Sequence, residues 1–189
     1  MEMPMKPLIL AATTALALAS PALAQGEASA PYGTPAFGVE PYVGVMGGYH
    51  DFDSGTHGVL QTGGSANGWL VGGYAGVNMP LGPLVVGVEA NGAKGFQDID
   101  WEYGATAHLG LRAGDSGMIF VRGGYQWIEG KRGFPNDRNE IYGIGVEVGP
   151  KDIGLGGLTT NAGVRLRLAV DTFDVFQSIR PSVGLTMHF

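Results

Sequence analysis

Residues 101–112 read Trp-Glu-Tyr-Gly-Ala-Thr-Ala-His-Leu-Gly-Leu-Arg, and an apolar residue occupies every second position. Side chains alternate between the two faces of a β-strand, so one face of this stretch is apolar and the other is small, polar or charged. An amphipathic helix would repeat its apolar residues every three to four positions instead. The stretch therefore predicts a strand with two very different faces.

The same alternation recurs along the rest of the chain, and turn-forming residues separate the segments. From Val39 onward no segment has an amphipathic helical pattern. The alternating segments are Val43–Tyr49, Trp69–Met79, Leu84–Ala90, Trp101–Arg112, Ile119–Trp127, Tyr142–Val148, Leu158–Val170 and Ile179–Phe189. This pattern predicts an all-β protein with eight strands.

The charged residues lie on the parity opposite to the apolar one, together with most of the glycines. They are Glu89, Glu102, His108, Arg112, Arg122, Glu147, Arg165, Arg167 and Arg180. A barrel in water would turn its charges outward, whereas an apolar exterior around a charged interior suits lipid. We therefore predict an eight-stranded antiparallel up-and-down transmembrane β-barrel whose lumen is filled by side chains.

A buried charge needs a partner, because an unpaired one costs several kcal/mol. We expect the interior charges to form an ion-pair network across the lumen, in which Glu89 and Glu147 share Arg122. Counting along the segments places Arg165 and Arg167 nearer the outside of the cell than this group. The same count places Arg180 and Glu102 nearer the outside. A gated ion path through the network is the alternative interpretation.

Tyrosine and tryptophan favour membrane interfaces, so their positions test the topology. With the barrel's N-terminus in the periplasm, the outward-facing aromatic residues all fall at the outer rim; they are Tyr49, Trp69, Trp101, Tyr103, Tyr125, Trp127 and Tyr142. The expected outer loops are residues 51–66, 93–100, 130–138 and 171–178. The expected periplasmic turns are residues 80–83, 113–117 and 149–157.

The first 24 residues have the three parts of a secretory signal peptide. Lys6 precedes an apolar run from Leu8 to Ala19, and Ala22-Leu23-Ala24 is a small-x-small cleavage site. The run is about half the length of a membrane-spanning helix, which needs roughly 20 apolar residues. We expect cleavage after Ala24, a flexible tail over residues 25–38 and a barrel domain over residues 39–189.

The two ends of the barrel segment resemble the small eight-stranded outer-membrane proteins of the opacity-type, OmpX-like and OmpA membrane-domain group. Pro41-Tyr42-Val43-Gly44-Val45-Met46-Gly47-Gly48-Tyr49 is similar to their first strand. Val183-Gly184-Leu185-Thr186-Met187-His188-Phe189 resembles the C-terminal signal, closed by Phe189, that the barrel-assembly machinery reads. The resemblance implies the Gram-negative outer membrane, reached by the general secretory route with periplasmic chaperones.

Composition and motifs narrow the function further. The net charge of −6 argues against a nucleic-acid partner, and the absence of cysteine removes disulfides and thiolate chemistry. The four histidines lack metal-ligand spacing, so we expect no metal and no cofactor. The lipid-facing parity carries no His and no Ser, so we expect no enzyme, and a lipid-A-modifying enzyme is the least favoured alternative.

The remaining functions are those of a surface protein. We expect a monomer in contact with outer-membrane lipids and lipopolysaccharide, with a role in envelope integrity and with short loops that could bind a host or cell-surface ligand. A narrow porin-like channel for ions or small solutes is the alternative.

Overall fold

The computed structural model describes residues 38–52, 66–113, 116–131, 136–149, 163–174 and 176–189. They form eight strands: β1 (Glu40–Phe52), β2 (Asn67–Leu81), β3 (Leu84–Gly95), β4 (Ile99–Ala113), β5 (Gly117–Gly130), β6 (Asp137–Val148), β7 (Val164–Phe173) and β8 (Ser178–His188). The signal peptide with its cleavage residues Ala22 and Ala24, and the tail up to residue 37, lie outside the described residues.

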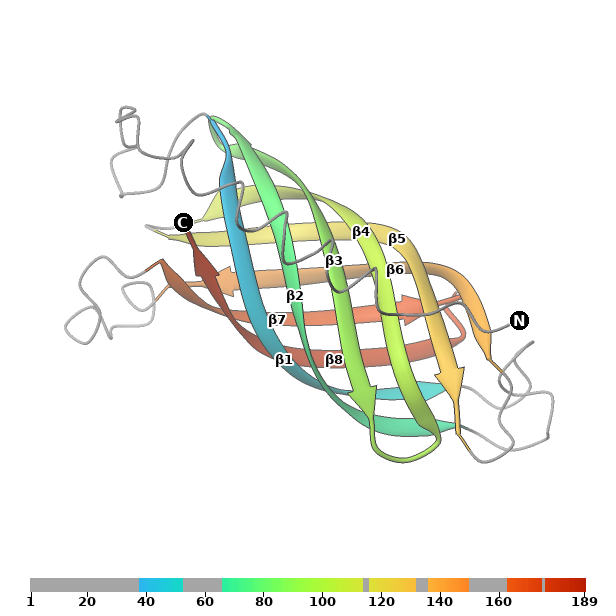
Figure 1. Cartoon of the computed structure of the whole chain (residues 1–189). Coiled ribbons are helices and arrows are strands. Elements are labelled where there is room, and N and C mark those ends of the chain that lie inside the picture. Colours follow the sequence, from blue (N-terminus) through green and yellow to red (C-terminus); the bar gives the residue numbers. More distant parts are fainter. Residues whose placement is uncertain (1–37, 53–65, 114–115, 132–135, 150–162, 175) are drawn as a thin grey trace, which may run out of the picture.

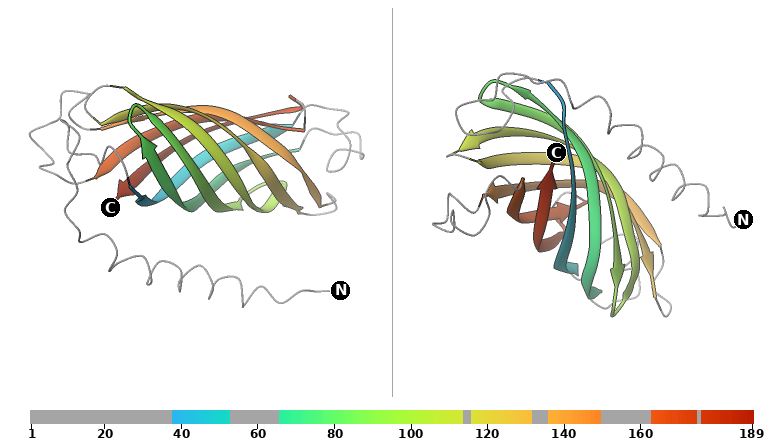
Figure 2. Two further views of the ribbon diagram at one scale, coloured as in Figure 1. Left: turned by 90° about the horizontal axis from the view of Figure 1, so that it is seen from above. Right: turned by 60° about the vertical axis from the view of Figure 1, so that its left-hand side comes forward.

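The strands form a closed antiparallel barrel in chain order (Figure 1). Each strand pairs with its neighbour in sequence, and β1 also pairs with β8, so the sheet has no free edge. The strands are strongly tilted against the barrel axis (Figure 2), as closure of a sheet into a barrel requires. The predicted eight-stranded up-and-down barrel is confirmed.

Two names describe the ends of the barrel below. The turn end is the end at which β1 begins and β8 finishes, and the loop end is the opposite one. At the turn end, Leu81 pairs with Leu84 across a two-residue connection of Gly82 and Pro83. Gly82 has a positive φ of 69°, which the first position of a tight hairpin turn requires and which glycine adopts without strain.

Among the described residues, no helix is long and apolar enough to cross a membrane.

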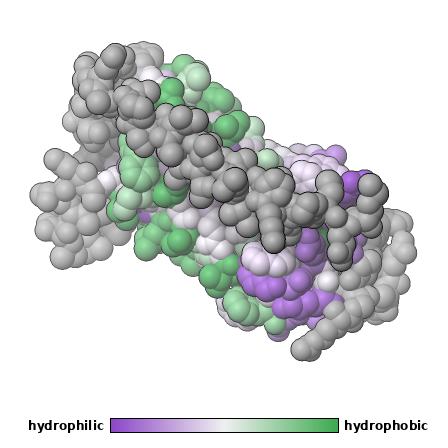
Figure 3. All heavy atoms as spheres, in the orientation of Figure 1, coloured by the Kyte–Doolittle hydropathy of each residue, from purple (hydrophilic) through white to green (hydrophobic). Residues whose placement is uncertain are grey.

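The outer wall of the barrel is apolar. The exposed large hydrophobic residues include Val45, Trp69, Val71, Met79, Val88, Leu109, Leu111, Ile119, Val121, Ile144, Val183 and Leu185. Apolar surface covers much of the visible wall, and hydrophilic surface gathers at the loop end, where β3 ends and β4 begins (Figure 3). This arrangement is the one that a strand wall in contact with acyl chains requires.

The strands reach farther toward the loop end than the alternation of apolar residues predicted. Asp51 lies in β1, Lys94 in β3 and Asp100 in β4, although all three were assigned to loops. Arg138 lies in β6 for the same reason. The prediction ended each strand at its last apolar residue, but backbone pairing continues into a polar rim.

The start and end of β7 also differ from the prediction. The described part of this strand starts at Val164 rather than Leu158 and ends at Phe173 rather than Val170; residues 150–162 lie outside the described residues. Asp171 was expected in an outer loop, but it lies within β7 and is 1% exposed. The strand is therefore shifted toward the loop end relative to the prediction.

The interior is not only small and charged, as the alternation suggested. One apolar cluster fills the loop end; it consists of Phe52, Ala66, Leu70, Ala93, Ile99, Ile128 and Phe173. A second cluster consists of Val85 from β3, Met118 and Phe120 from β5, and Ala169 from β7. Some inward positions have no room for a side chain, because a Cβ on Gly72 would overlap Gly92 and Ala93 of the neighbouring strand.

Candidate functional site

The structure places the charged side chains of the predicted network inside the barrel. Those buried in the lumen are Glu89, Glu102, His108, Arg122, Glu147, Arg165, Arg167 and Arg180. Arg112, at the turn end, retains 16% side-chain exposure. The ion pairs among these groups and their neighbours run continuously from one end of the lumen to the other.

The chain of ion pairs begins at the turn end with Glu40. Its carboxylate accepts hydrogen bonds from Arg112 Nη2 at 3.2 Å and from Arg165 Nη2 at 2.9 Å. Arg165 also donates to Glu147, over 3.5 Å. The imidazole of His188 lies between the two carboxylates, with Nδ1 2.8 Å from Glu40 and Nε2 3.0 Å from Glu147. Residues from five strands are thereby held together.

Arg167 occupies the middle of the lumen and joins two carboxylates. Its Nε donates to Glu147 Oε1 at 2.7 Å, and its Nη1 donates to Glu89. The guanidinium lies 4.2 Å from the ring centroid of Tyr74, within the range of a cation–π contact. Tyr42 donates its hydroxyl proton to Glu89 at 2.9 Å. The ring of Tyr74 therefore packs against the guanidinium, and the hydroxyl of Tyr42 shares Glu89 with it.

The pairing continues from Glu89 toward the loop end. Arg122 Nη1 donates to Glu89 at 3.2 Å, while its Nε and Nη2 donate to the two oxygens of Asp171 at 2.7 and 2.6 Å. Arg180 donates to Asp171 at 3.0 Å and to Glu102 at 2.9 Å. The contact between Arg122 and Asp171 is bidentate, the geometry in which guanidinium–carboxylate pairs are strongest.

The chain of ion pairs is balanced in charge. Its carboxylates are Glu40, Glu89, Glu102, Glu147 and Asp171, and its guanidinium groups are Arg112, Arg122, Arg165, Arg167 and Arg180. Every carboxylate thus has a cationic neighbour, as groups withdrawn from water require.

The middle of the lumen is also full. The space enclosed by Glu89, His108, Met118, Phe120, Arg122 and Arg167 has no room for a water molecule. In the described part of the chain, no cluster of three or more metal-ligating side chains is present. These side chains therefore fill the described lumen at this level.

Two details of the predicted network are wrong. Arg122 pairs with Glu89 and Asp171, whereas Glu147 pairs with Arg165 and Arg167. The latter two arginines lie in the half of the lumen nearer the turn end, not nearer the outside. The first error comes from assuming that neighbouring strands bring Arg122 and Glu147 together, whereas Arg122 lies opposite Gly143 and Glu147 lies opposite Met118. The second follows from the start assigned to β7, because beginning that strand at Leu158 places Arg165 and Arg167 too far along the barrel.

The sequence interpretation missed four charged or ionisable members of the chain. Glu40, Asp171 and His188 belong to it, and His50 joins it at the loop end through a 2.5 Å contact with Glu102. Each of these residues has the inward parity of its strand. They could have been identified by listing every second, inward-facing residue over the full length of β1, β7 and β8.

His108 is buried in the lumen, but its hydrogen-bond partner is an amide. Its Nε2 lies 2.8 Å from Asn78 Oδ1, and its ring packs against Phe120 with centroids 5.9 Å apart. The imidazole therefore belongs to the packing around the ion pairs and not to the sequence of salt bridges.

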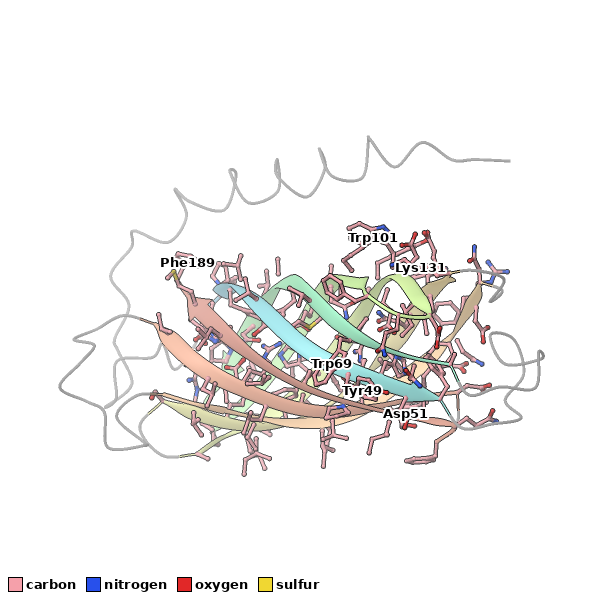
Figure 4. The ribbon with its side chains drawn as sticks, turned by 90° about the horizontal axis from the view of Figure 1, so that it is seen from below. Tyr49, Asp51, Trp69, Trp101, Lys131 and Phe189 are labelled. Carbon is pink, nitrogen blue, oxygen red and sulfur yellow. The ribbon has the colours of Figure 1, made fainter. Side chains whose placement is uncertain are left out.

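The aromatic residues predicted at the rim lie on the outer wall, toward the loop end. Tyr49 contacts Trp69 with ring centroids 5.1 Å apart, while Trp127 contacts Tyr103 at 5.9 Å and Tyr125 at 5.0 Å. Tyr49, Trp69 and Trp101 lie on the side of the barrel away from Phe189 (Figure 4).

Trp101 and Tyr142, the other two aromatic residues predicted at the rim, are also exposed, as is Phe189 at the end of the chain. Trp101 is 38% exposed and Tyr142 is 46% exposed. Phe189, the predicted assembly signal, follows β8 at the turn end and is 60% exposed. Its backbone N–H donates to Pro41 at 2.9 Å.

Comparison with solved structures bears on the fold. The attachment invasion locus protein Ail of Yersinia pestis is similar over 80% of this chain and 99% of its own, with a TM-score of 0.50 and 12% identity. This chain has the fold of the small eight-stranded outer-membrane β-barrels. Such a barrel crosses the bilayer with its strands.

Two further small barrels are similar at slightly lower scores. Neisserial surface protein A matches 80% of this chain and 99% of its own, with 16% identity and a TM-score of 0.49. The N-terminal barrel domain of Pseudomonas aeruginosa OprF matches 78% and 97%, with 12% identity and a TM-score of 0.47. No protein-family model and no curated protein matches the sequence.

Proposed function

We propose that this chain is an integral protein of the Gram-negative outer membrane with a structural and surface-exposed role. The observation that carries the proposal is the apolar outer wall around a lumen in which carboxylates and guanidinium groups balance. Such a protein adds a rigid, closed element to the envelope and presents its loop end to the surroundings. This role requires no catalysis and no cofactor.

The proposed orientation puts the loop end outside the cell. Tyr49 lies late in β1, Trp69 early in β2 and Trp101 early in β4, toward that end, where Trp and Tyr would meet the headgroup region. The partners we propose are outer-membrane lipids and lipopolysaccharide around the wall, and the barrel-assembly machinery and periplasmic chaperones during export. The loops would offer the surface for any host or cell-surface ligand, with the barrel as a monomer.

A narrow channel is the second candidate, and no feature of the described lumen favours it. The pocket around Arg122 and Arg167 holds no water-sized space, and the apolar cluster that includes Phe52 and Phe173 fills the loop end. Conduction would require several buried ion pairs to separate at once, and breaking each one is costly.

Two measurements test the proposal. The protein should be recovered in outer-membrane fractions and should migrate faster on a gel before heating than after it, as folded barrels do. Recovery in the soluble periplasmic fraction would refute the membrane role. Purified barrel in a planar bilayer should then give no sustained current, whereas steady single-channel steps would establish the channel instead.

A further inference from the structure

Three side chains at the loop end form a hydrogen-bonded relay of serine, histidine and carboxylate. His50 Nδ1 lies 2.5 Å from Glu102 Oε1, and His50 Nε2 lies 2.9 Å from Ser178 Oγ. The three residues come from β1, β4 and β8. A hydroxyl within hydrogen-bond reach of an imidazole, which a carboxylate orients through its other nitrogen, is the arrangement that activates a serine nucleophile.

The partners of His50 and Glu102 are compatible with this chemistry. The second oxygen of Glu102 accepts a hydrogen bond from Arg180 Nη1 at 2.9 Å. In the tautomer whose Nδ1–H donates to Glu102, His50 Nε2 accepts a hydrogen bond from Ser178. The Phe173 backbone N–H donates to Ser178 Oγ at 3.0 Å, which leaves the hydroxyl proton to point at His50.

The backbone just before Ser178 is strained. Asp174 has a φ of 48° and Phe176 has a φ of 66°, values in the left-handed region that bulky side chains rarely adopt. In the described chain these are the non-glycine residues with positive φ. Strained backbone of this kind persists where the surrounding structure requires it, and it clusters at functional sites.

The backbone pairing between β1 and β8 is interrupted beside His50. Between β1 and β8 the paired residues pass from Gly48 and Ser182 directly to Asp51 and Ile179. Pro181, which has no backbone N–H to donate, lies in this interruption. The wall next to His50 is therefore held less firmly by backbone hydrogen bonds than the rest of the barrel.

The surroundings of the relay are apolar. The ring of Phe52 stacks on His50 with centroids 3.9 Å apart, and Phe173 meets His50 edge-on at 6.3 Å. Phe176, at the tip of the strained turn, is 79% exposed. Phe52 and Phe173 belong to the apolar cluster that fills this end, and His50 and Glu102 are 0% exposed while Ser178 is 7% exposed. A substrate would reach Ser178 only through the interrupted pairing of β1 and β8, past these rings, which favours an apolar chain on its reacting carbonyl group.

We propose that Ser178, His50 and Glu102 form a hydrolytic site for carboxylic esters with apolar acyl chains, a function beyond the structural role proposed above. Ser178 Oγ attacks the ester carbonyl carbon and passes its proton to His50 Nε2. The bond to the alcohol breaks, and the alcohol leaves with that proton. Water then attacks the acyl-serine, giving up a proton through His50, and releases the carboxylic acid and the free serine. Glu102 is a positioning residue for His50.

An active-site-directed fluorophosphonate probe tests the proposal on the wild-type protein, folded in detergent micelles. The probe should attach to Ser178, as located by peptide mass spectrometry, and Ser178→Ala should abolish the attachment. Ser182→Ala, in the same strand, is the matched control and should leave it unchanged. Absence of labelling on the folded wild-type barrel, or labelling that survives Ser178→Ala, would overturn the proposal.

Hydrolysis of p-nitrophenyl butyrate separates the roles of the other two residues. His50→Gln should lower the rate by about 100-fold or more, the usual contribution of a general base. Glu102→Gln should lower kcat while leaving KM unchanged, because it alters the imidazole and not the binding of the ester. The heat-modifiable gel shift checks the folding of each variant. Rates equal to wild type in folded His50→Gln protein would refute the relay.

Discussion

Replacing Arg167 with methionine cuts the chain of ion pairs at its centre. Arg167 is the guanidinium that joins the turn-end group to Glu89 in the described lumen, through its contacts with Glu147 and Glu89. Methionine keeps most of the side-chain volume, so the change removes charge and hydrogen bonds with little cavity. The substitution leaves two buried carboxylates with fewer cationic neighbours.

The expected cost follows from the partners that remain. Glu147 keeps Arg165 and His188, and Glu89 keeps Arg122 and Tyr42. Breaking a buried pair costs about 3–5 kcal/mol, and these surviving contacts put Arg167→Met near the lower limit, about 3 kcal/mol. For a protein of this size that corresponds to a fall in Tm of about 6–12 °C.

The assay is the temperature at which the gel mobility of the purified barrel changes, supported by urea unfolding followed through tryptophan fluorescence. Arg138→Met is the control, because Arg138 is exposed at the loop end and its replacement should cost no more than about 0.5 kcal/mol. Combining Arg167→Met with Glu89→Gln should cost less than the sum of the two changes, since they share one contact. Equal midpoints for Arg167→Met and Arg138→Met would show that the buried pairing contributes nothing to stability.

Three further experiments test the wall and the lumen. Gly72→Ala should destabilise the barrel by about 1–3 kcal/mol, because the added Cβ would overlap a neighbouring strand. Gly92→Ala is the control and should be tolerated, because its Cβ would face open space. Equal shifts of the urea midpoint in the two variants would contradict this. Val121→Arg, on the outer wall within β5, should lower the free energy of unfolding by about 2–4 kcal/mol. Leu81→Arg, at the rim, should lower it by only about 0–1 kcal/mol. Equal losses of stability for the two variants in lipid vesicles would argue against a bilayer around the wall. Wild-type barrel should block chloride flux from vesicles over minutes, and rapid release would show an open lumen.

The alternation of residues was sufficient to predict the architecture. In 101–112 and the other segments, the period of two gave the strands and their faces, because any slip of one residue would turn apolar side chains into the lumen. The ends of strands were not predictable in the same way. Backbone pairing at Asp51 or Asp171 depends on the neighbouring strand and leaves no mark in hydropathy.

The candidate site was only partly predictable for a related reason. Inward parity correctly located charged residues such as Arg122 and Glu147, yet parity does not give the height of a side chain along the barrel. The partners of each charge depend on that height: Glu147 lies opposite Met118 rather than Arg122, and Asp171, which was assigned to a loop, is the partner that Arg122 finds instead. The relay of His50, Glu102 and Ser178 joins three distant strands, and nothing in local sequence brings these together.

Most links in the chain of ion pairs connect strands that are not adjacent in the sheet. Glu89 of β3 meets Arg167 of β7, and Glu102 of β4 meets Arg180 of β8. A partly curled ribbon cannot make these contacts, and it would expose bare guanidinium groups to hydrocarbon. We therefore expect entry into the bilayer and joining of the first strand to the last to be coupled, so that a half-inserted ribbon is not a stable state.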